Sequence, residues 1–331
     1  MTLSEFLDEW HNDAPTVRVM TSGSTGKPKP MLAEKKRMAA SARATCRFLG
    51  LERGDTALLC MPLDFIAGKM VVVRSIVCGL HLIDIPPCSH PLKDLTEPPV
   101  FAAMVPLQVY NSMIDDHERA LLMGIKHLII GGGAVDEALG EQLRRFPNAV
   151  WSTYGMTETL SHIAMRRLSG SEASTWYTPF DNVEVSLSED GCLVIDAPTV
   201  CRTRLRTNDI AVIDSDGRRF RIIGRMDNVI CSGGLKIHIE EIEETLKQAM
   251  NVTFMITKVK DRQLGEAMVM LTLPGDSEEA KRVCREILPR HRRPRHYIEV
   301  EKLPMTATGK PARAEAMNMA EKMIGTKNNG I

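Results

Sequence analysis

Small hydroxyl side chains and glycines gather in one short run near the start of the 331-residue chain. The run consists of Thr21, Ser22, Gly23, Ser24, Thr25, Gly26, Lys27, Pro28 and Lys29. Glycine lets the backbone approach a ligand closely, and free N–H and O–H groups can surround phosphate oxygens. The run therefore predicts a phosphate-binding loop, and a flexible turn is the alternative that it leaves open. The spacing G-x-x-x-x-G-K-[ST] of P-loop kinases and ATPases does not occur in the chain.

A second polar group comes directly after the predicted strand 149–153. It consists of Tyr154, Gly155, Met156, Thr157 and Glu158. In a parallel α/β sheet, ligands bind outside the carboxyl ends of the strands. Thr157 could hold a phosphate oxygen there, and Glu158 could bind a hard cation such as Mg²⁺. A Thr-Glu pair in this place is also typical of a helix N-cap.

Other polar residues stand at turns in the second half of the chain. Asp209, in the sequence Thr207-Asn208-Asp209 ahead of a predicted strand, could accept hydrogen bonds from both ribose hydroxyls. An ordinary turn aspartate is the competing interpretation. Lys310 stands beside Gly309 on a predicted loop near the C-terminus, where an isolated lysine is usually solvated.

The elements that must position these residues alternate between strands and helices in the first half of the chain. Predicted strands cover 16–20, 56–61, 80–85, 100–105, 126–130 and 149–153, and predicted helices include 33–49, 66–78 and 135–146. Such alternation predicts an α/β fold with a mostly parallel sheet and flanking helices. Around the phosphate-binding loop it predicts the order strand, loop, helix, which is the layout of a nucleotide site.

The pattern changes after about residue 168. Two predicted hairpins, 183–197 and 210–223, indicate a small β-subdomain. A mixed region follows, with predicted helices at 239–250 and 277–288 and strands at 252–259 and 267–273. We place a domain boundary at 225–228. The expected organisation is therefore an N-terminal core, residues 1–226, and a smaller α+β C-terminal domain, residues 227–331.

Composition excludes several classes of protein. The 42 basic and 42 acidic residues give a net charge of zero, so no overall field attracts nucleic acid or a membrane surface. No apolar run approaches the roughly 20 residues of a membrane span. The eight cysteines form no Cys-x-x-Cys pair, and no export signal precedes them, so we expect reduced thiols in the cytoplasm. A basic cluster within 281–296 is interpreted as a solvated helix face, and binding of a ligand phosphate or of nucleic acid is the alternative.

In order and spacing, these segments resemble the core motifs of the adenylate-forming superfamily. That superfamily contains acyl-CoA synthetases, adenylation domains of peptide synthetases and luciferases. The match runs from Thr21 to Arg313, nearly the whole chain. The resemblance implies ATP and Mg²⁺, coenzyme A as a co-substrate, and a C-terminal domain that moves between two half-reactions.

The resemblance also implies roles for individual residues. The ATP site would contain Thr21, Ser22, Gly23, Ser24, Thr25, Gly26, Lys29, Gly132, Gly133, Ala134, Tyr154, Gly155, Met156, Thr157, Asp209 and Arg225. Lys310, Thr157 and Glu158 would be catalytic, with Glu158 on Mg²⁺ and Lys310 between the acyl carboxylate and the α-phosphate. Asp227 would be the hinge. Gly233 and Gly234 would line the coenzyme A tunnel.

The segment 61–69, followed by Arg74, is similar to the acyl-site helix of the o-succinylbenzoate–CoA ligases of menaquinone synthesis. The resemblance assigns Lys69, Arg74 and Ser161 to the acyl substrate, with Arg74 binding the carboxylate that does not react. The alternative places Arg74 on the solvated face of its helix. Its apolar neighbours argue for an inward-facing side chain.

The chain departs from the family pattern in three places. Only 20 residues precede the loop, which indicates a shortened N-terminal region; Phe65 stands where histidine is common; and Asn208 replaces a usual glycine. We therefore expect an ATP-dependent acid–CoA ligase acting on o-succinylbenzoate, as a monomer or homodimer without nucleic-acid or membrane partners. The alternatives are another aryl- or acyl-CoA synthetase, an adenylation domain that loads a carrier protein, and a truncated non-catalytic nucleotide-binding protein.

Overall fold

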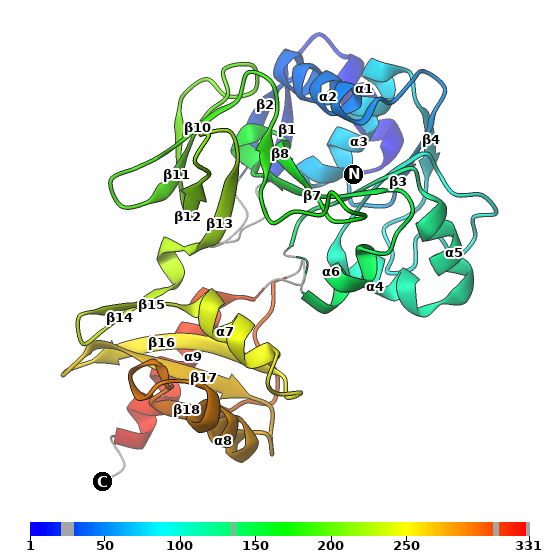
Figure 1. Cartoon of the computed structure of the whole chain (residues 1–331). Coiled ribbons are helices and arrows are strands. Elements are labelled where there is room, and N and C mark those ends of the chain that lie inside the picture. The colour runs from blue at the N-terminus through cyan, green and yellow to red at the C-terminus, as the bar shows by residue number, and fades with distance from the viewer. Residues whose placement is uncertain (21–29, 134, 136, 307–310, 329–331) are drawn as a thin grey trace.

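The computed structural model describes residues 1–20, 30–133, 135, 137–306 and 311–328. The phosphate-binding loop, Ala134 and Lys310 therefore lie outside the described residues. Figure 1 shows an upper body, built from the first two thirds of the chain, joined through the end of β13 to a lower body that carries the C-terminus.

A seven-stranded sheet forms the centre of the upper body, in the order β4-β3-β5-β6-β7-β8-β9. The strands from β4 to β7 are parallel, and β8 and β9 join antiparallel. The strands are β3 (Thr56–Leu59), β4 (His81–Asp84), β5 (Phe101–Met104), β6 (His127–Ile130), β7 (Ala149–Gly155), β8 (His162–Arg167) and β9 (Thr178–Pro179). The mostly parallel sheet expected from the sequence is confirmed.

Helices cover both faces of this sheet (Figure 1). They are α1 (Leu3–His11), α2 (Lys35–Leu49) and α3 (Ile66–Cys78) on one face, and α4 (Pro106–Ile114), α5 (Asp116–Gly124) and α6 (Glu137–Leu143) on the other. Successive side chains of a strand point to opposite faces. Accordingly Phe101 and Ala103 join the core under α1–α3, while Ala102 and Met104 join the core over α4–α6. Burial on both faces explains why these strands are apolar throughout.

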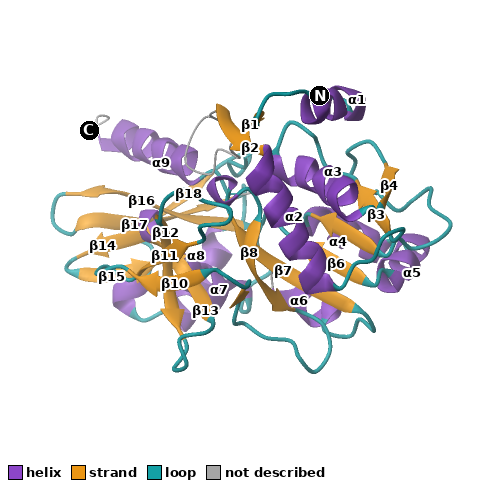
Figure 2. Ribbon diagram, turned by 90° about the horizontal axis from the view of Figure 1, so that it is seen from above, coloured by secondary structure: helices purple, strands orange, loops and turns teal. Residues whose placement is uncertain are grey.

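The expected order of strand, loop and helix around residues 21–29 is wrong in one respect. A second strand, β2 (Pro30–Glu34), follows the loop and pairs antiparallel with β1 (Thr16–Met20). The helix that we predicted from residue 33 begins at Lys35. Ala33 is buried opposite Val17, so cross-strand packing holds these residues in extended backbone. Figure 2 shows the two-stranded ribbon beside α2 and apart from the central sheet.

The predicted hairpins form one antiparallel sheet in the order β10-β11-β12-β13. Its strands are β10 (Glu184–Leu187), β11 (Cys192–Asp196), β12 (Leu205–Ile213) and β13 (Phe220–Arg225). Thr207–Asp209 was expected ahead of a strand, but it lies inside β12. The strand begins at Leu205 because this polar segment pairs with β11 and β13 despite its lack of apolar alternation.

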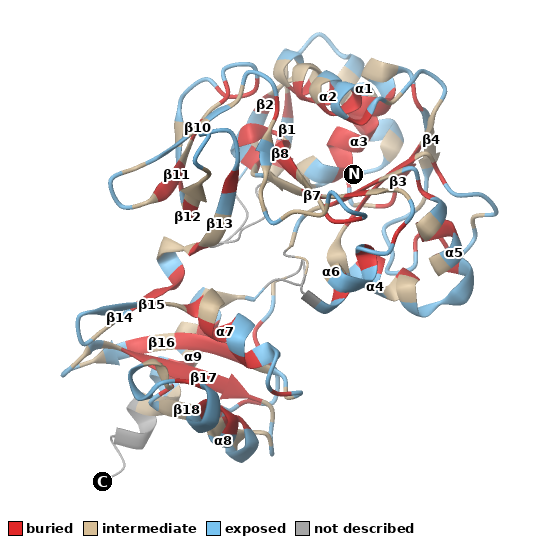
Figure 3. Ribbon diagram, viewed as in Figure 1, coloured by how far each residue is buried: buried red, intermediate tan, exposed pale blue. Residues whose placement is uncertain are grey.

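The lower body is built on a second mixed sheet. Its strands are β14 (Val229–Ser232), β15 (Leu235–His238), β16 (Phe254–Asp261), β17 (Gly265–Thr272) and β18 (His296–Glu299). Helices α7 (Ile239–Lys247) and α8 (Ser277–Ile287) pack on one face, and α9 (Arg313–Asn328) packs on the other. Figure 3 shows β16 and β17 buried between these layers. Their two cores contain only residues after β13, so this body has a hydrophobic interior of its own.

None of the helices in the described part of the chain is long and apolar enough to cross a membrane.

Candidate active site

The carboxyl end of β7 carries the motif from Tyr154 to Glu158. Gly155 packs so tightly against the next segment that a Cβ atom there would lie 2.3 Å from the carbonyl oxygen of Ser161. Only glycine fits this approach. A short 3₁₀ turn, Thr157–Thr159, follows, in which Thr157 is buried and Glu158 is exposed. The Glu158 carboxylate therefore lies at the edge of the sheet where the parallel strands end.

The residue after this turn holds an unusual backbone conformation. Leu160 has a φ of 65°, in the left-handed region that side chains other than glycine rarely adopt. A hydrogen bond of 2.9 Å from the Leu160 N–H to the Thr157 carbonyl closes the turn. Such strained residues cluster at active sites, where the surrounding structure holds them in place. Here the turn directs Ser161 back toward the core.

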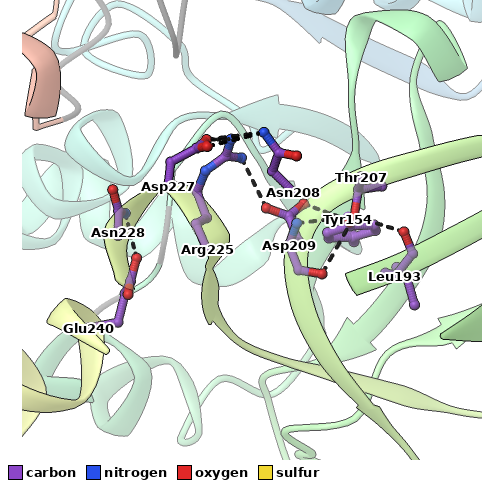
Figure 4. Close-up of polar contacts among 9 residues, drawn as sticks. All are labelled: Tyr154, Leu193, Thr207, Asn208, Asp209, Arg225, Asp227, Asn228 and Glu240. Carbon is purple, nitrogen blue, oxygen red and sulfur yellow. Dashed lines mark hydrogen bonds and ion pairs between the residues drawn. The ribbon is translucent and has the colours of Figure 1, made fainter. Parts of the chain in front are cut away.

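Asp209 is held between two partners from different parts of the chain (Figure 4). The Tyr154 hydroxyl donates to Asp209 Oδ2 at 2.7 Å, and Arg225 Nη1 donates to Asp209 Oδ1 at 2.9 Å. Asp209 and Arg225 face each other across the β12–β13 pair. Burial, and then the Asp209 carboxylate, raise the pKa of Tyr154, so its hydroxyl remains a donor. The carboxylate is thereby oriented before any ligand binds.

The predicted hinge residue, Asp227, is tied to the strands before it (Figure 4). Arg225 Nη2 donates to Asp227 Oδ2 at 2.9 Å, and Asn208 Nδ2 lies 3.2 Å from both carboxylate oxygens. Burial lowers the pKa of Arg225, but the hydrogen bond to Asp227 and the neighbouring carboxylates outweigh it and raise the pKa. The Asn208 side chain therefore restrains the carboxylate of Asp227.

The predicted glycines at 132–133 and 233–234, and Gly131 directly before the first pair, differ in what the backbone requires of them. Gly131 could not carry a side chain, because a Cβ atom would lie 2.7 Å from Thr153 Oγ1. Gly132 has a φ of 78° at the carboxyl end of β6, and Gly133 follows it. Gly233 and Gly234, with φ of 58° and 83°, form the exposed turn between β14 and β15.

Arg74 is the largest fully buried side chain of the described residues, with 2% of its surface exposed. Its Nη2 donates to Ser161 Oγ at 2.6 Å. Its Nε has no hydrogen-bond partner, and none of the described acidic residues forms an ion pair with it. Burial lowers the pKa of Arg74 to about 10. The solvated helix face considered for Arg74 is therefore wrong.

Lys69, five residues before Arg74 in α3, points in another direction. Its Nζ lies 3.4 Å from Glu9 Oε2 of α1 and 4.6 Å from the centre of the Phe6 ring. Burial lowers the pKa of Lys69, while Glu9 raises it. The Lys69 side chain contacts Met1, Glu9 and Phe6 of the N-terminal segment, and among the described residues it makes no hydrogen bond to Arg74 or Ser161. The structure thus gives Lys69 a packing role under α1.

The described residues on either side of the segment 307–310, which contains Lys310, contact one another. Met305 and Pro311 form an antiparallel bridge, and the Ala312 N–H donates to the Pro304 carbonyl at 2.9 Å. Arg313 then makes two hydrogen bonds of 2.7 Å to the two carboxylate oxygens of Glu243. Bidentate pairs of this kind fix geometry as well as charge. Sequence reasoning named Arg313 only as the end of a motif and overlooked Glu243 as its partner.

Glu158 is the predicted Mg²⁺ ligand. No three His, Cys, Asp or Glu side chains come together within the described ranges. A single exposed carboxylate still suits Mg²⁺, because this ion commonly takes one or two protein carboxylates and completes its shell with water and substrate phosphates. Glu158, at the end of β7, could hold Mg²⁺ in that way.

The basic cluster lines a cleft of about 580 Å³ on the lower body, between α8, β18 and α9. Lys281 pairs with Glu278, and Arg295 pairs with Asp261. Arg293 donates to two backbone carbonyls near the end of α8, at 2.7 Å each. Lys281, Arg293 and Arg295 thus already have partners within the lower body.

Comparison with known proteins agrees with the geometry. The profile of the family described as AMP-binding enzyme matches residues 5–197. The chain belongs to this family. It is 25% identical over 337 residues to a 2-succinylbenzoate–CoA ligase of Listeria monocytogenes, covering 93% of this chain and 71% of that protein. It is 27% identical over 342 residues to the Bacillus licheniformis protein of the same name, covering 93% and 70%.

Solved structures of similar proteins share the fold. An acyl-CoA synthetase (AMP-forming)/AMP-acid ligase II-like protein from Dyadobacter fermentans is 31% identical, with a TM-score of 0.65. The match covers 96% of this chain and 92% of the Dyadobacter chain. An O-succinylbenzoate coenzyme A synthetase from Bacillus subtilis, solved with ATP and magnesium, is 22% identical with a TM-score of 0.74. The match covers 92% of this chain and 70% of the B. subtilis chain, and at this identity it supports the fold alone. The resemblance to adenylate-forming enzymes is confirmed.

Proposed function

We propose that this member of the AMP-binding family is an ATP-dependent acid–CoA ligase that adenylates 2-succinylbenzoate and transfers the acyl group to coenzyme A. Its place would be menaquinone synthesis. The observation that carries the proposal is the buried guanidinium of Arg74, which donates to Ser161 and has no acidic partner among the described residues.

An unpaired buried charge is expensive, and proteins rarely keep one without a ligand or a function. A fatty-acid enzyme would place apolar side chains in an acyl pocket. A substrate with a second carboxylate needs a fixed cation instead, and a guanidinium can bind it through two donors. Because Arg74 is 2% exposed, entry of that carboxylate requires covering side chains to move, and the free Nε is a donor that it would engage.

The other end of the site would bind ATP. Asp209, already oriented by Tyr154 and Arg225, would accept hydrogen bonds from the ribose hydroxyls. Thr157 at the end of β7 would contact the α-phosphate, and the loop of residues 21–29 would hold the β- and γ-phosphates. That loop leaves β1 next to the start of α3, because Met20 bridges to Phe65, so phosphates there would lie beside the helix that carries Arg74.

The reaction brings two anions together, because the acid carboxylate attacks the α-phosphate. Mg²⁺ bound at Glu158 would supply positive charge to the phosphate oxygens. Lys310 would bind between the attacking carboxylate and the α-phosphate and stabilise the charge that develops there. Pyrophosphate leaves, and the acyl-adenylate that forms is attacked by the thiol of coenzyme A, with AMP as the leaving group.

We also propose that residues 1–226 and 227–331 act as two domains. Their separate cores support this division. The C-terminal domain would turn about Asp227, first presenting Lys310 for adenylation and then the Gly233–Gly234 turn for thioester formation. We expect a monomer or homodimer in the cytoplasm, since eight free cysteines suit a reducing compartment.

Acid-dependent exchange of pyrophosphate into ATP tests the proposal. We expect exchange with 2-succinylbenzoate and much weaker exchange with benzoate or a fatty acid. Exchange with those acids but none with 2-succinylbenzoate would favour the second candidate, another acyl-CoA synthetase, to which the Dyadobacter similarity lends support. Exchange without thioester formation from coenzyme A would favour loading of a carrier protein. No exchange with any acid would favour a non-catalytic nucleotide-binding protein.

A further inference from the structure

A chain of hydrogen bonds runs from Arg74 into the core of the upper body. Arg74 Nη2 lies 2.6 Å from Ser161 Oγ, and Ser161 Oγ lies 3.3 Å from His162 Nδ1. His162 Nε2 lies 2.9 Å from Thr45 Oγ1, which lies 3.2 Å from the Ser41 carbonyl oxygen. Except for the half-buried Ser161, each member is at most 8% exposed.

The donor and the acceptor of each hydrogen bond in this series can be assigned by starting from the Ser41 carbonyl. The Ser41 carbonyl can only accept, so the Thr45 hydroxyl donates to it, and the Thr45 oxygen must accept from His162 Nε2–H. Burial, and then the charge of Arg74, hold the pKa of His162 well below its ordinary value, so the ring is neutral and carries one proton. His162 Nδ1 is therefore an acceptor.

The position of the proton on His162 decides whether the Ser161 hydroxyl donates to the ring or accepts from it. With Nδ1 as acceptor, the Ser161 hydroxyl donates a hydrogen bond to this nitrogen. The Ser161 oxygen then presents its lone pairs to the Arg74 guanidinium, which has only donors. The opposite tautomer would leave Ser161 and His162 facing each other with two donors. One arrangement of protons thus gives each hydrogen bond from Arg74 Nη2 to Thr45 one donor and one acceptor, while Arg74 Nε keeps no partner.

We propose that His162 is a positioning residue that holds the guanidinium of Arg74 through Ser161, and that Thr45 selects the tautomer of His162 on which this depends. This inference rests on the proposed function, in which Arg74 binds the second carboxylate of the acid. A neutral partner suits that task, because it fixes the direction of the guanidinium without cancelling its charge. An aspartate or glutamate in the place of Ser161, which contacts the guanidinium directly, would bind Arg74 more tightly and compete with the substrate.

A packing role for His162 is the competing explanation. Its ring lies edge-on to Phe180, with centroids 5.4 Å apart and planes at 81°. The variant His162→Phe keeps an aromatic ring against Phe180 and removes both hydrogen bonds. The variant His162→Gln can keep both bonds, since its amide oxygen can accept from Ser161 and its NH₂ can donate to Thr45.

Steady-state pyrophosphate exchange on the full chain separates the two roles. For His162→Phe we expect the KM for 2-succinylbenzoate to rise about tenfold, the effect of losing roughly one hydrogen bond to a charged group, with the KM for ATP unchanged. We expect His162→Gln to restore most of the loss. An unchanged KM for the acid, or an equal rise for acid and ATP, would overturn the proposal. If His162→Phe does not fold, Thr45→Val takes its place, with a rise in the same KM expected and an unchanged KM as the contrary result.

A second measurement does not depend on the substrate. The ¹⁵N chemical shifts of His162, assigned by comparison with His162→Gln, report which ring nitrogen carries the proton. We expect the Nε2–H tautomer in the wild type and a mixture of the two neutral tautomers in Thr45→Val. A protonated Nδ1 would overturn the proposal even if the enzyme proves to use 2-succinylbenzoate. Conversely, an inactive wild type with the Nε2–H tautomer would remove the proposed function and leave the hydrogen-bond chain in place.

Discussion

Replacing Arg74 by methionine should make the protein more stable while it weakens binding of the acid. Burial lowers the pKa of Arg74 to about 10, which corresponds to roughly 3 kcal/mol against the charged form at 1.36 kcal/mol for each pKa unit. The hydrogen bond to Ser161 returns about 1.5 kcal/mol of this. Ser161 keeps His162 as its acceptor in the variant, so no donor of Ser161 is left without a partner. We therefore expect the free energy of unfolding to rise by about 1–2 kcal/mol in Arg74→Met.

Thermal unfolding followed by circular dichroism measures this change. A gain of 1–2 kcal/mol corresponds to a rise of about 3–6 °C in Tm for a domain of this size. In the same variant, the KM for 2-succinylbenzoate should rise at least about tenfold, as expected for the loss of one charged contact.

Arg313→Met is the matched control, because Arg313 is also a mostly buried guanidinium but has Glu243 as a bidentate partner. Removing one member of a buried pair leaves the other charge uncompensated, so this variant should lose about 3 kcal/mol. We therefore expect the free energy of unfolding to rise in Arg74→Met and to fall in Arg313→Met. A fall in Tm of several degrees for Arg74→Met would make Arg74 a structural residue and refute the reasoning.

Three further predictions concern the proposed catalytic lysine, the proposed hinge and the dependence of stability on pH. Lys310→Ala should slow adenylate formation on the order of 10²–10³-fold and nearly spare thioester formation from supplied acyl-adenylate, and equal loss in stopped-flow assays of both steps would argue against two conformations. Asn208→Gly should release the carboxylate of Asp227, the proposed hinge residue. We expect the ratio of the two half-reaction rates to change, with little effect on the KM for ATP. An unchanged ratio would show that the asparagine does not restrain the hinge. Because the folded-state pKa of His162 lies well below 6.5, the unfolded chain binds the extra proton first as pH falls below about 6.5. Urea titrations should then show wild type losing up to about 1.4 kcal/mol more than His162→Gln for each pH unit below that value, and parallel curves would contradict a neutral His162.

Much of the fold follows from local sequence pattern. The predicted helix 66–78 coincides with α3, because Gly79 ends it with a φ of 68° and the apolar run before it packs into the core. The strands of the central sheet were recognisable because burial on both faces makes them apolar throughout. The strand β2 was missed, since its short sequence is held extended by pairing with β1 rather than by its own preference.

The candidate site was predictable in its residue types and less so in its contacts. Polar residues after one predicted strand and ahead of another pointed to Tyr154 and Asp209, but their direct hydrogen bond joins residues 55 positions apart. His162 and Thr45, 117 positions apart, carried no motif that marks them as partners. Such contacts depend on the packing of α2 against β8, which no periodicity in one sequence encodes. The one local signal was that a histidine directly follows Ser161 at the start of a buried strand.

Product analysis of the complete reaction tests the central claim most directly. The chain is incubated with ATP, Mg²⁺, 2-succinylbenzoate and coenzyme A, and the products are separated and identified by mass spectrometry. The account predicts AMP and 2-succinylbenzoyl-CoA in a ratio of about one to one, with no acyl-CoA when benzoate replaces the dicarboxylate. ADP as the nucleotide product, or benzoyl-CoA formed as readily as the succinylbenzoyl thioester, would contradict it.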